Sequence, residues 1–160
     1  MHRIAIVVAD ASRARIFTYE AGALEQPNGT PPLREWIDLV DPERRLRPSQ
    51  VFSDSRPGSS SAPHGPSFAV DDHRDAHTDE TDRRFAGAIV NHLGDVLAEH
   101  PSREVVIVAS PNMLGLLRKD TADLPRLGME VHELALDLTR ETPSRLHDHL
   151  AERGLLPARR

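Results

Sequence analysis

The sequence predicts one α/β domain built on a mixed sheet of about five strands, with helices on its faces. Two apolar runs without polar alternation, residues 4–9 and 105–109, have the pattern of strands that are covered on both faces. A stretch with helical periodicity lies between them, and a helical crossover makes the strands that it joins parallel. Two more helical patterns and a weaker strand follow. The predicted order of elements is βββαβαβα.

Length and composition restrict the class of protein. The chain has 160 residues, the size of a single domain, and we treat residues 1–160 as one unit. It has no cysteine and no apolar run of roughly 18 residues, which argues against disulfides, thiolate zinc sites and a membrane span. Its formal charge of -5 argues against bulk, non-specific binding of nucleic acid. We therefore expect a cytoplasmic protein that does not bind membranes, and homo-oligomers remain open.

The first three strands form a predicted antiparallel meander. A turn that starts at Asp10 separates the run at 4–9 from a β-branched and aromatic segment at 14–19, which is close enough to pair with it as a hairpin. The segment 33–39 alternates apolar and polar residues, as an edge strand does. We expect its apolar residues to share one face; these are Leu33, Ile37 and Leu39.

A long polar insert follows the meander, at about residues 42–78. Ser, Pro and Gly dominate residues 53–67, so we expect no packed structure there and assign the greatest mobility to residues 47–72. Helical periodicity resumes after Thr78, a predicted N-cap, and should end near His100.

The last third of the chain completes the sheet and its cover. Ser110 and Pro111 have the residue types that start a helix directly after the second apolar strand, and Gly128 precedes the weaker strand at 129–134. Thr142 should cap the final helix. A three-stranded meander joined through a helical crossover to parallel strands is the ribonuclease-H-like arrangement, which is the fold class that we predict.

The parallel strands place a candidate crevice at their carboxyl ends. Open α/β sheets bind ligands at this edge, and the predicted pairing brings Asp10 there together with Ser110 and Asn112. The alternative is that Asp10 only organises an Asx-type turn. A ribonuclease-H-type nuclease also needs a carboxylate at the end of the second central strand, and residues 105–112 supply none.

A second candidate site is the polar cluster before the long helix. His73 and His77 have the i, i+4 spacing that can chelate a divalent metal, and Asp72 is adjacent. With Asp10, these residues would support a metal-dependent hydrolase or nuclease. The alternative is a solvated acidic helix start. The sequence indicates no cofactor other than such a metal.

The insert also has a locally basic beginning. Its arginines have two open interpretations: they grip phosphates, or they pair with the acidic stretch at residues 71–82. The residues concerned are Arg44, Arg45, Arg47 and Arg56.

Five short segments, residues 7–17, 42–45, 53–58, 84–86 and 109–118, occur in order along nearly the whole chain. Together they resemble the bacterial host attachment family, proteins required for attachment to host cells. That family is in turn similar to the central domain of archaeal and eukaryotic peptide release factors, whose sheet is shared with certain ribosomal proteins. The resemblance implies a fold of that type.

The resemblance also implies a partner. In release factors a long loop after the first strands carries a Gly-Gly-Gln motif into the peptidyl-transferase centre, and the polar insert lies in the corresponding place. Here Gln50 has no preceding glycines, which argues against peptidyl-tRNA hydrolysis. The resemblance therefore implies a binding module rather than an enzyme. Its partner would be the ribosome or another structured RNA, contacted by the arginines of the insert.

Overall fold

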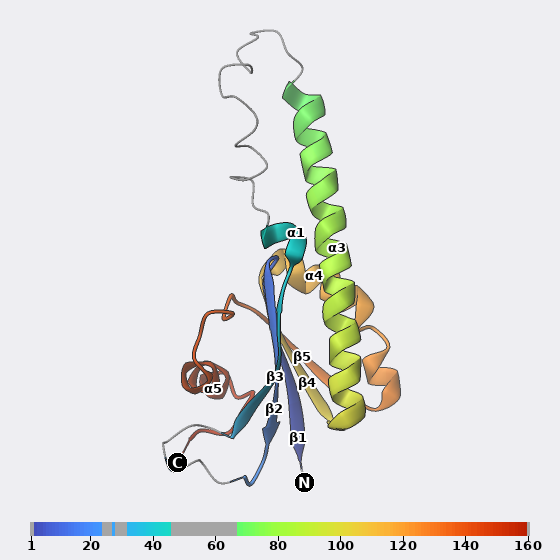
Figure 1. Cartoon of the computed structure of the whole chain (residues 1–160). Helices are drawn as coiled ribbons and strands as arrows, with labels where there is room; N and C mark the ends of the chain where they lie inside the picture. Colours follow the sequence, from blue (N-terminus) through green and yellow to red (C-terminus); the bar gives the residue numbers. More distant parts are fainter. Residues whose placement is uncertain (1, 24–26, 28–31, 46–66, 160) are drawn as a thin grey trace.

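A five-stranded mixed sheet in the order β3-β2-β1-β4-β5 forms the centre of the molecule (Figure 1). The computed structural model describes residues 2–23, 27, 32–45 and 67–159, with the backbone alone at 44–45 and 67–76. The strands are β1 (Arg3–Ala9), β2 (Arg13–Glu20), β3 (Leu33–Val40), β4 (Glu104–Ala109) and β5 (Glu130–Ala135). The helices are α1 (Pro42–Arg45), α3 (Ser67–Glu99), α4 (Pro111–Asp120), the 3-10 turn η1 (Leu124–Leu127) and α5 (Pro143–Glu152).

The two apolar strands lie side by side at the centre of the sheet. β1 pairs antiparallel with β2 and parallel with β4, and β4 pairs parallel with β5. Every residue from Ile4 to Ala9 and from Val105 to Ala109 is buried. The mixed α/β sheet with central strands at these two runs is therefore confirmed.

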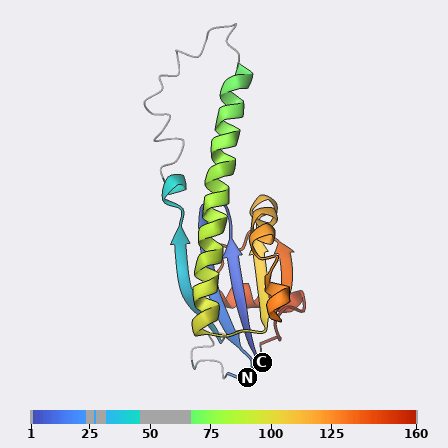
Figure 2. The ribbon, with the colours of Figure 1, turned by 90° about the vertical axis from the view of Figure 1, so that its right-hand side faces the viewer.

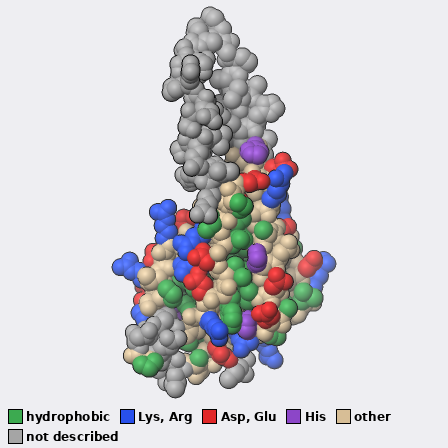
Figure 3. All heavy atoms as spheres, viewed as in Figure 1, with side chains coloured by type: hydrophobic (Ala, Val, Ile, Leu, Met, Phe, Trp, Pro, Cys, Tyr) green, Lys and Arg blue, Asp and Glu red, His purple; other side chains and the backbone are tan. Residues whose placement is uncertain are grey.

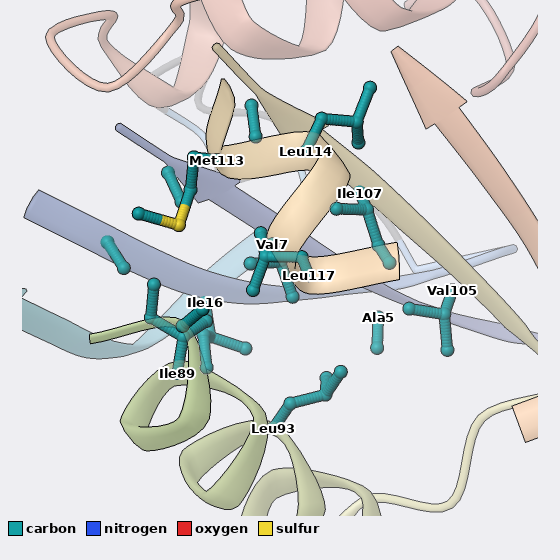
Figure 4. Close-up of a cluster of buried hydrophobic side chains, with 14 of the residues drawn as sticks. Ala5, Val7, Ile16, Ile89, Leu93, Val105, Ile107, Met113, Leu114 and Leu117 are labelled. Carbon is teal, nitrogen blue, oxygen red and sulfur yellow. The ribbon is translucent and has the colours of Figure 1, made fainter. Parts of the chain in front are cut away.

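Helices cover both faces of the sheet (Figure 2). On one face, Ile89 and Leu93 of α3 and Met113 of α4 pack against β-strand residues such as Val7 and Ile107 (Figure 4). The other face packs against α5. This second cluster includes Ile6, Phe17, Val106, Leu146 and Leu150. Because side chains alternate along a strand, each central strand supplies both clusters.

The prediction that Leu33 shares one face of the edge strand with Ile37 and Leu39 is wrong. Leu33 packs with α5, whereas Ile37 and Leu39 pack on the α3 face. The pairing with β2 shifts at a β-bulge, where Ile37 and Glu35 oppose consecutive β2 residues and Trp36 is the extra residue. An extra residue reverses the alternation beyond it, which a strict period of two does not anticipate.

The long helix begins earlier than the sequence predicts. α3 starts at Ser67 and ends at Glu99, so Thr78 lies inside the helix and is not its N-cap. Most of the residues at 67–77 are polar but, unlike Gly65 and Pro66, none of them is a helix breaker. The short helix α1 was also not predicted. Of the segment expected to be most mobile, residues 47–66 lie outside the described residues, and 67–72 are helical.

The length of α3 makes it project from the domain. Its 33 residues span about 50 Å, against about 20–27 Å for strands of this sheet. The amino-terminal half of α3 therefore stands beyond the carboxyl edge of β1 and β4, with α1 beside it near that edge (Figures 1 and 2). In the described part of the chain, no helix is both long enough and apolar enough to cross a membrane.

Candidate functional site at the carboxyl edge of the sheet

Two of the predicted crevice residues leave neighbouring strands at the same level. Ala9 and Ala109 are paired in the parallel register, so Asp10 and Ser110 follow directly paired positions. The Ser110 amide donates to the Ala9 carbonyl at 3.3 Å. The sequence thus correctly indicated that β1 and β4 bring these residues to one edge.

The carboxylate of Asp10 is surrounded by donors from its own turn and from the far end of the chain. Its Oδ1 accepts bonds from the amides of Ser12 (2.8 Å) and Arg13 (2.7 Å) and from the Ser12 hydroxyl (3.0 Å). Its Oδ2 accepts a bond from the Thr139 hydroxyl at 3.1 Å. The Asx turn expected as the alternative is therefore present, and the carboxylate also joins β1 to the segment after β5.

These bonds keep Asp10 ionised. Burial of the side chain on its own raises its pKa, but the bonds from Ser12, Arg13 and Thr139 favour the charged form more strongly and hold the pKa of Asp10 below its ordinary value. At neutral pH the group is an anion that accepts hydrogen bonds. It is poorly suited to give up a proton as a general acid.

Thr139 lies between two carboxylates. Its buried hydroxyl is 3.1 Å from Asp10 Oδ2 and 2.8 Å from Asp137 Oδ1, although a hydroxyl has only one proton to donate. Asp137 is exposed and also accepts the amide of Thr139 at 3.2 Å. Water can therefore solvate Asp137, while the Thr139 hydroxyl donates its hydrogen bond to the less accessible Asp10.

Asn112, the third predicted crevice residue, turns toward α3 instead. Its side-chain amide donates to Oδ2 of Asp82 at 3.2 Å, and Asp82 is buried. Ser110 occupies the N-cap position of α4, but its side chain makes no capping bond. These residues make structural hydrogen bonds at the strand edge. The carboxylate of Asp82 beside the first turn of α4 disfavours an anion there.

Three buried residues near this edge were missed by the sequence interpretation, Asp82, Arg15 and Thr139. Asp82 lies on the same stripe of α3 as Phe85 and Ile89, so a charge at a buried helical position was the available signal. Arg15 is a charged residue on the same, α5-facing side of β2 as the buried Phe17, and a charge on that buried side was again the available signal. Thr139 had no local signal, because its partner is 129 residues away.

Arg15 connects the edge strand to the segment before α5. Its guanidinium contacts both carboxylate oxygens of Glu35 on β3, through Nε at 2.7 Å and Nη2 at 3.0 Å. Its Nη1 donates to the carbonyls of Thr139 (3.3 Å) and Glu141 (2.7 Å). The same segment that reaches Asp10 is thus held by a second, buried donor.

The other predicted site residues lie partly or wholly outside the described residues. Arg44 and Arg45 belong to α1 and Asp72 and His73 to α3, in each case with only the backbone described. Arg47 and Arg56 lie outside altogether, and His77 is exposed on α3. Among the described side chains, no three His, Asp or Glu residues are placed to share a metal ion.

Comparison with known proteins decides the family. Residues 5–150 match the family described as "Protein required for attachment to host cells". The chain belongs to this host attachment family. The match covers β1 from Ala5 onward, the other four strands and most of α5, which agrees with the family resemblance of the sequence. No curated protein matches the chain.

Proposed function

We propose that this host attachment protein is a cytoplasmic binding module of translation-factor-like ancestry, which contacts the ribosome or another structured RNA through the insert between β3 and α3. The projection of α3 carries this proposal, because the start of α3, which directly follows the insert in the chain, stands beyond the edge of the sheet. The sheet order β3-β2-β1-β4-β5, with β1 parallel to β4, supports a ribonuclease-H-like classification of the fold.

The charges of the body also favour the insert as the contact. On the face seen in Figure 3, basic and acidic side chains of the described residues are intermixed. Arginines of the body pair with carboxylates. Examples are Arg13 with Asp38 at 2.7 Å and Arg118 with Glu133 at 2.6 Å. Paired guanidiniums have less to gain from a phosphate. We therefore look for the phosphate contacts outside these paired arginines, in the insert arginines that the family resemblance indicates.

Co-sedimentation with ribosomes tests this proposal. The test variant replaces Arg44, Arg45, Arg47 and Arg56 by Ala. The control replaces four exposed cationic residues of the body: Arg103, Lys119, Arg126 and Arg145. Both variants lose four positive charges. A difference in their ribosome binding would therefore depend on where the charges were removed and not on net charge.

We expect the wild type and the control to co-sediment at low salt, and the test variant to be lost from the pellet. Binding should weaken steeply with salt, and each removed phosphate contact should lower the salt slope by about one unit. Equal binding of the two variants would exclude the insert arginines as contacts. Absence of wild-type binding at low salt would contradict the translation hypothesis itself.

A metal-dependent hydrolase is the second candidate, and one observation favours it. Positions 73 and 77 both lie within α3, one helical turn apart, as chelation by two histidines requires. Calorimetric titration with manganese or zinc tests it, with His73→Ala and His77→Ala as variants. A tight signal that both variants abolish would support the site. A signal that they leave unchanged would exclude these ligands.

A further inference from the structure

The short helix α1 is held in place by contacts outside itself. Four residues make about one turn, which has no stability of its own in water. Its first turn is capped by the buried Asp41, whose Oδ1 accepts the amide of Glu43 at 3.0 Å. The amide of Asp41 in turn donates to the Ser12 carbonyl at 2.9 Å, which fixes the start of α1 to the turn after β1.

Glu43 joins α1 to α3. Its Oε2 accepts the Thr81 hydroxyl at 2.9 Å, and its Oε1 accepts Nη1 of Arg84 at 3.2 Å. Thr81 is buried, whereas Arg84 is exposed and also donates to Glu80 at 2.9 Å. The bond to Thr81 is part-buried, whereas the bond to Arg84 is exposed, so water and salt weaken the Thr81 bond less.

This connection lies at the root of the projecting part of α3. Residues 67–80 precede Thr81 and extend for about 20 Å. The views in Figures 1 and 2 both place α1 beside α3 below this projection. A contact at the root sets how α1, and the backbone of Arg44 and Arg45 within it, stand relative to α3.

We infer that Glu43 is a positioning residue, which clamps α1 to α3 through Thr81 and so fixes the root of the partner-binding insert. Its effect on binding rests on the proposed function. The clamp itself is a property of the free protein.

The direction in which RNA affinity changes when a carboxylate is removed separates this positioning role from simple electrostatics. Glu43→Ala and Glu80→Ala each remove one carboxylate from Arg84, but only the first releases α1. Electrostatics alone predicts that both variants bind RNA as well as the wild type or better. The clamp predicts that Glu43→Ala binds ribosomes about tenfold more weakly, whereas Glu80→Ala is not weakened.

Two further variants refine the comparison. Glu43→Gln removes the charge but keeps a carbonyl oxygen that accepts the Thr81 hydroxyl, so it should restore most of the binding that Glu43→Ala loses. Thr81→Val removes the hydroxyl without a change of charge, so it should weaken binding as Glu43→Ala does. Equal binding of Glu43→Ala and Glu80→Ala would overturn the clamp and leave the proposed function intact.

Hydrogen exchange of the free full-length protein tests the clamp without any partner. Amides of residues 41 and 43–45 should exchange about tenfold faster in Glu43→Ala and Thr81→Val than in the wild type, Glu80→Ala and Glu43→Gln. Amides of β1 and β4 serve as internal reference and should not change. Unchanged exchange at 41–45 would overturn the clamp. Faster exchange in a protein that never binds ribosomes would support the clamp and contradict the proposed function.

Discussion

Asp10 shows how one side chain couples protonation to stability. Its pKa is lowered in the folded protein, so the folded state favours the ionised form. The resulting stabilisation is fully present above the unfolded value near 3.8 and is lost as the pH falls through the folded value. Asp10→Ala should lower the free energy of unfolding by about 1–2 kcal/mol at pH 7, after allowance for the partial exposure of the group.

Urea unfolding at pH 7 and pH 3 measures this effect, and the single tryptophan, Trp36, provides the signal. Trp36 stacks on His100 with ring centroids 3.9 Å apart and donates its indole N–H to Thr18 at 2.8 Å, so its fluorescence reports the packing of β3. The difference between Asp10→Ala and the wild type should shrink at pH 3. Asp95→Ala, an exposed carboxylate on α3, is the control. An undiminished difference at pH 3 would contradict the role of ionisation.

Thr139 provides a second test at the same scale. Thr139→Val keeps the shape of the side chain but removes the donor to Asp10, so it should destabilise the protein by about 1 kcal/mol at pH 7. Thr139→Ser keeps the hydroxyl and should lose less. In a double-mutant cycle with Asp10→Ala, the two losses should be less than additive, because both remove the same bond. Additive losses would show that the bond contributes nothing.

The sequence indicated this site only in part, for reasons visible in individual residues. Asp10 and Ser110 were placed correctly because each directly follows an apolar run, and parallel neighbours end at one edge. The Asn112–Asp82 bond and the Thr139–Asp10 bond depend on how helices and loops pack across 30 and 129 residues of chain. Local sequence patterns carry no information about contacts between residues this far apart in the chain.

At the scale of elements, α3 contains glycines that its packing does not require. A Cβ at Gly87 or Gly94 would meet no atom within 4 Å, and neither residue has a positive φ. Gly87→Ala and Gly94→Ala should therefore each stabilise the protein by about 0.5–1 kcal/mol, since alanine loses less backbone entropy in a helix.

Thermal unfolding of the single and double variants checks this expectation. Gly128→Ala is the opposing control, because Gly128 has a φ of 83° at the end of η1 and a side chain there is strained. That variant should be destabilised. Destabilisation by Gly87→Ala and Gly94→Ala as well would show that this face of α3 is covered in solution by something outside the described contacts.

Elements were predictable where one local signal dominated. The central strands follow from uninterrupted apolar runs, and the Thr142 cap of α5 is present, with its hydroxyl accepting the Arg145 amide at 3.3 Å. The bulge at Trp36 and the early start of α3 were not predicted. A bulge changes only one register step, and polar residues near 67–77 suit a helix or a loop equally well. The helix α1 depends on Asp41 and Glu43 and is too short for a periodic signal.

At the scale of the whole molecule, Arg15 ties together regions that are distant in sequence. It lies between Glu35 on β3 and the carbonyls of Thr139 and Glu141, across 20 residues in one direction and 124 or more in the other. The Arg15 side chain is 8% exposed and its bond to the Thr139 carbonyl is buried, so its loss leaves that carbonyl with little water to replace it. Arg15 thereby fixes the approach of the chain to α5.

Replacement of Arg15 by Ala should destabilise the whole fold by about 3 kcal/mol, because it removes a buried guanidinium that makes a part-buried bidentate ion pair together with two backbone bonds. Arg15→Lys keeps the charge but cannot form the fork, so its loss should be smaller but clear. Arg118→Ala is the matched control: it breaks a fork of similar geometry to Glu133, but on the exposed surface, and should change stability little. Urea unfolding followed by Trp36 fluorescence and by circular dichroism should give coincident transitions for all variants, since Arg15 acts on the fold as a unit. If Arg15→Ala is no less stable than Arg118→Ala, the link through Arg15 does not hold the sheet and α5 together.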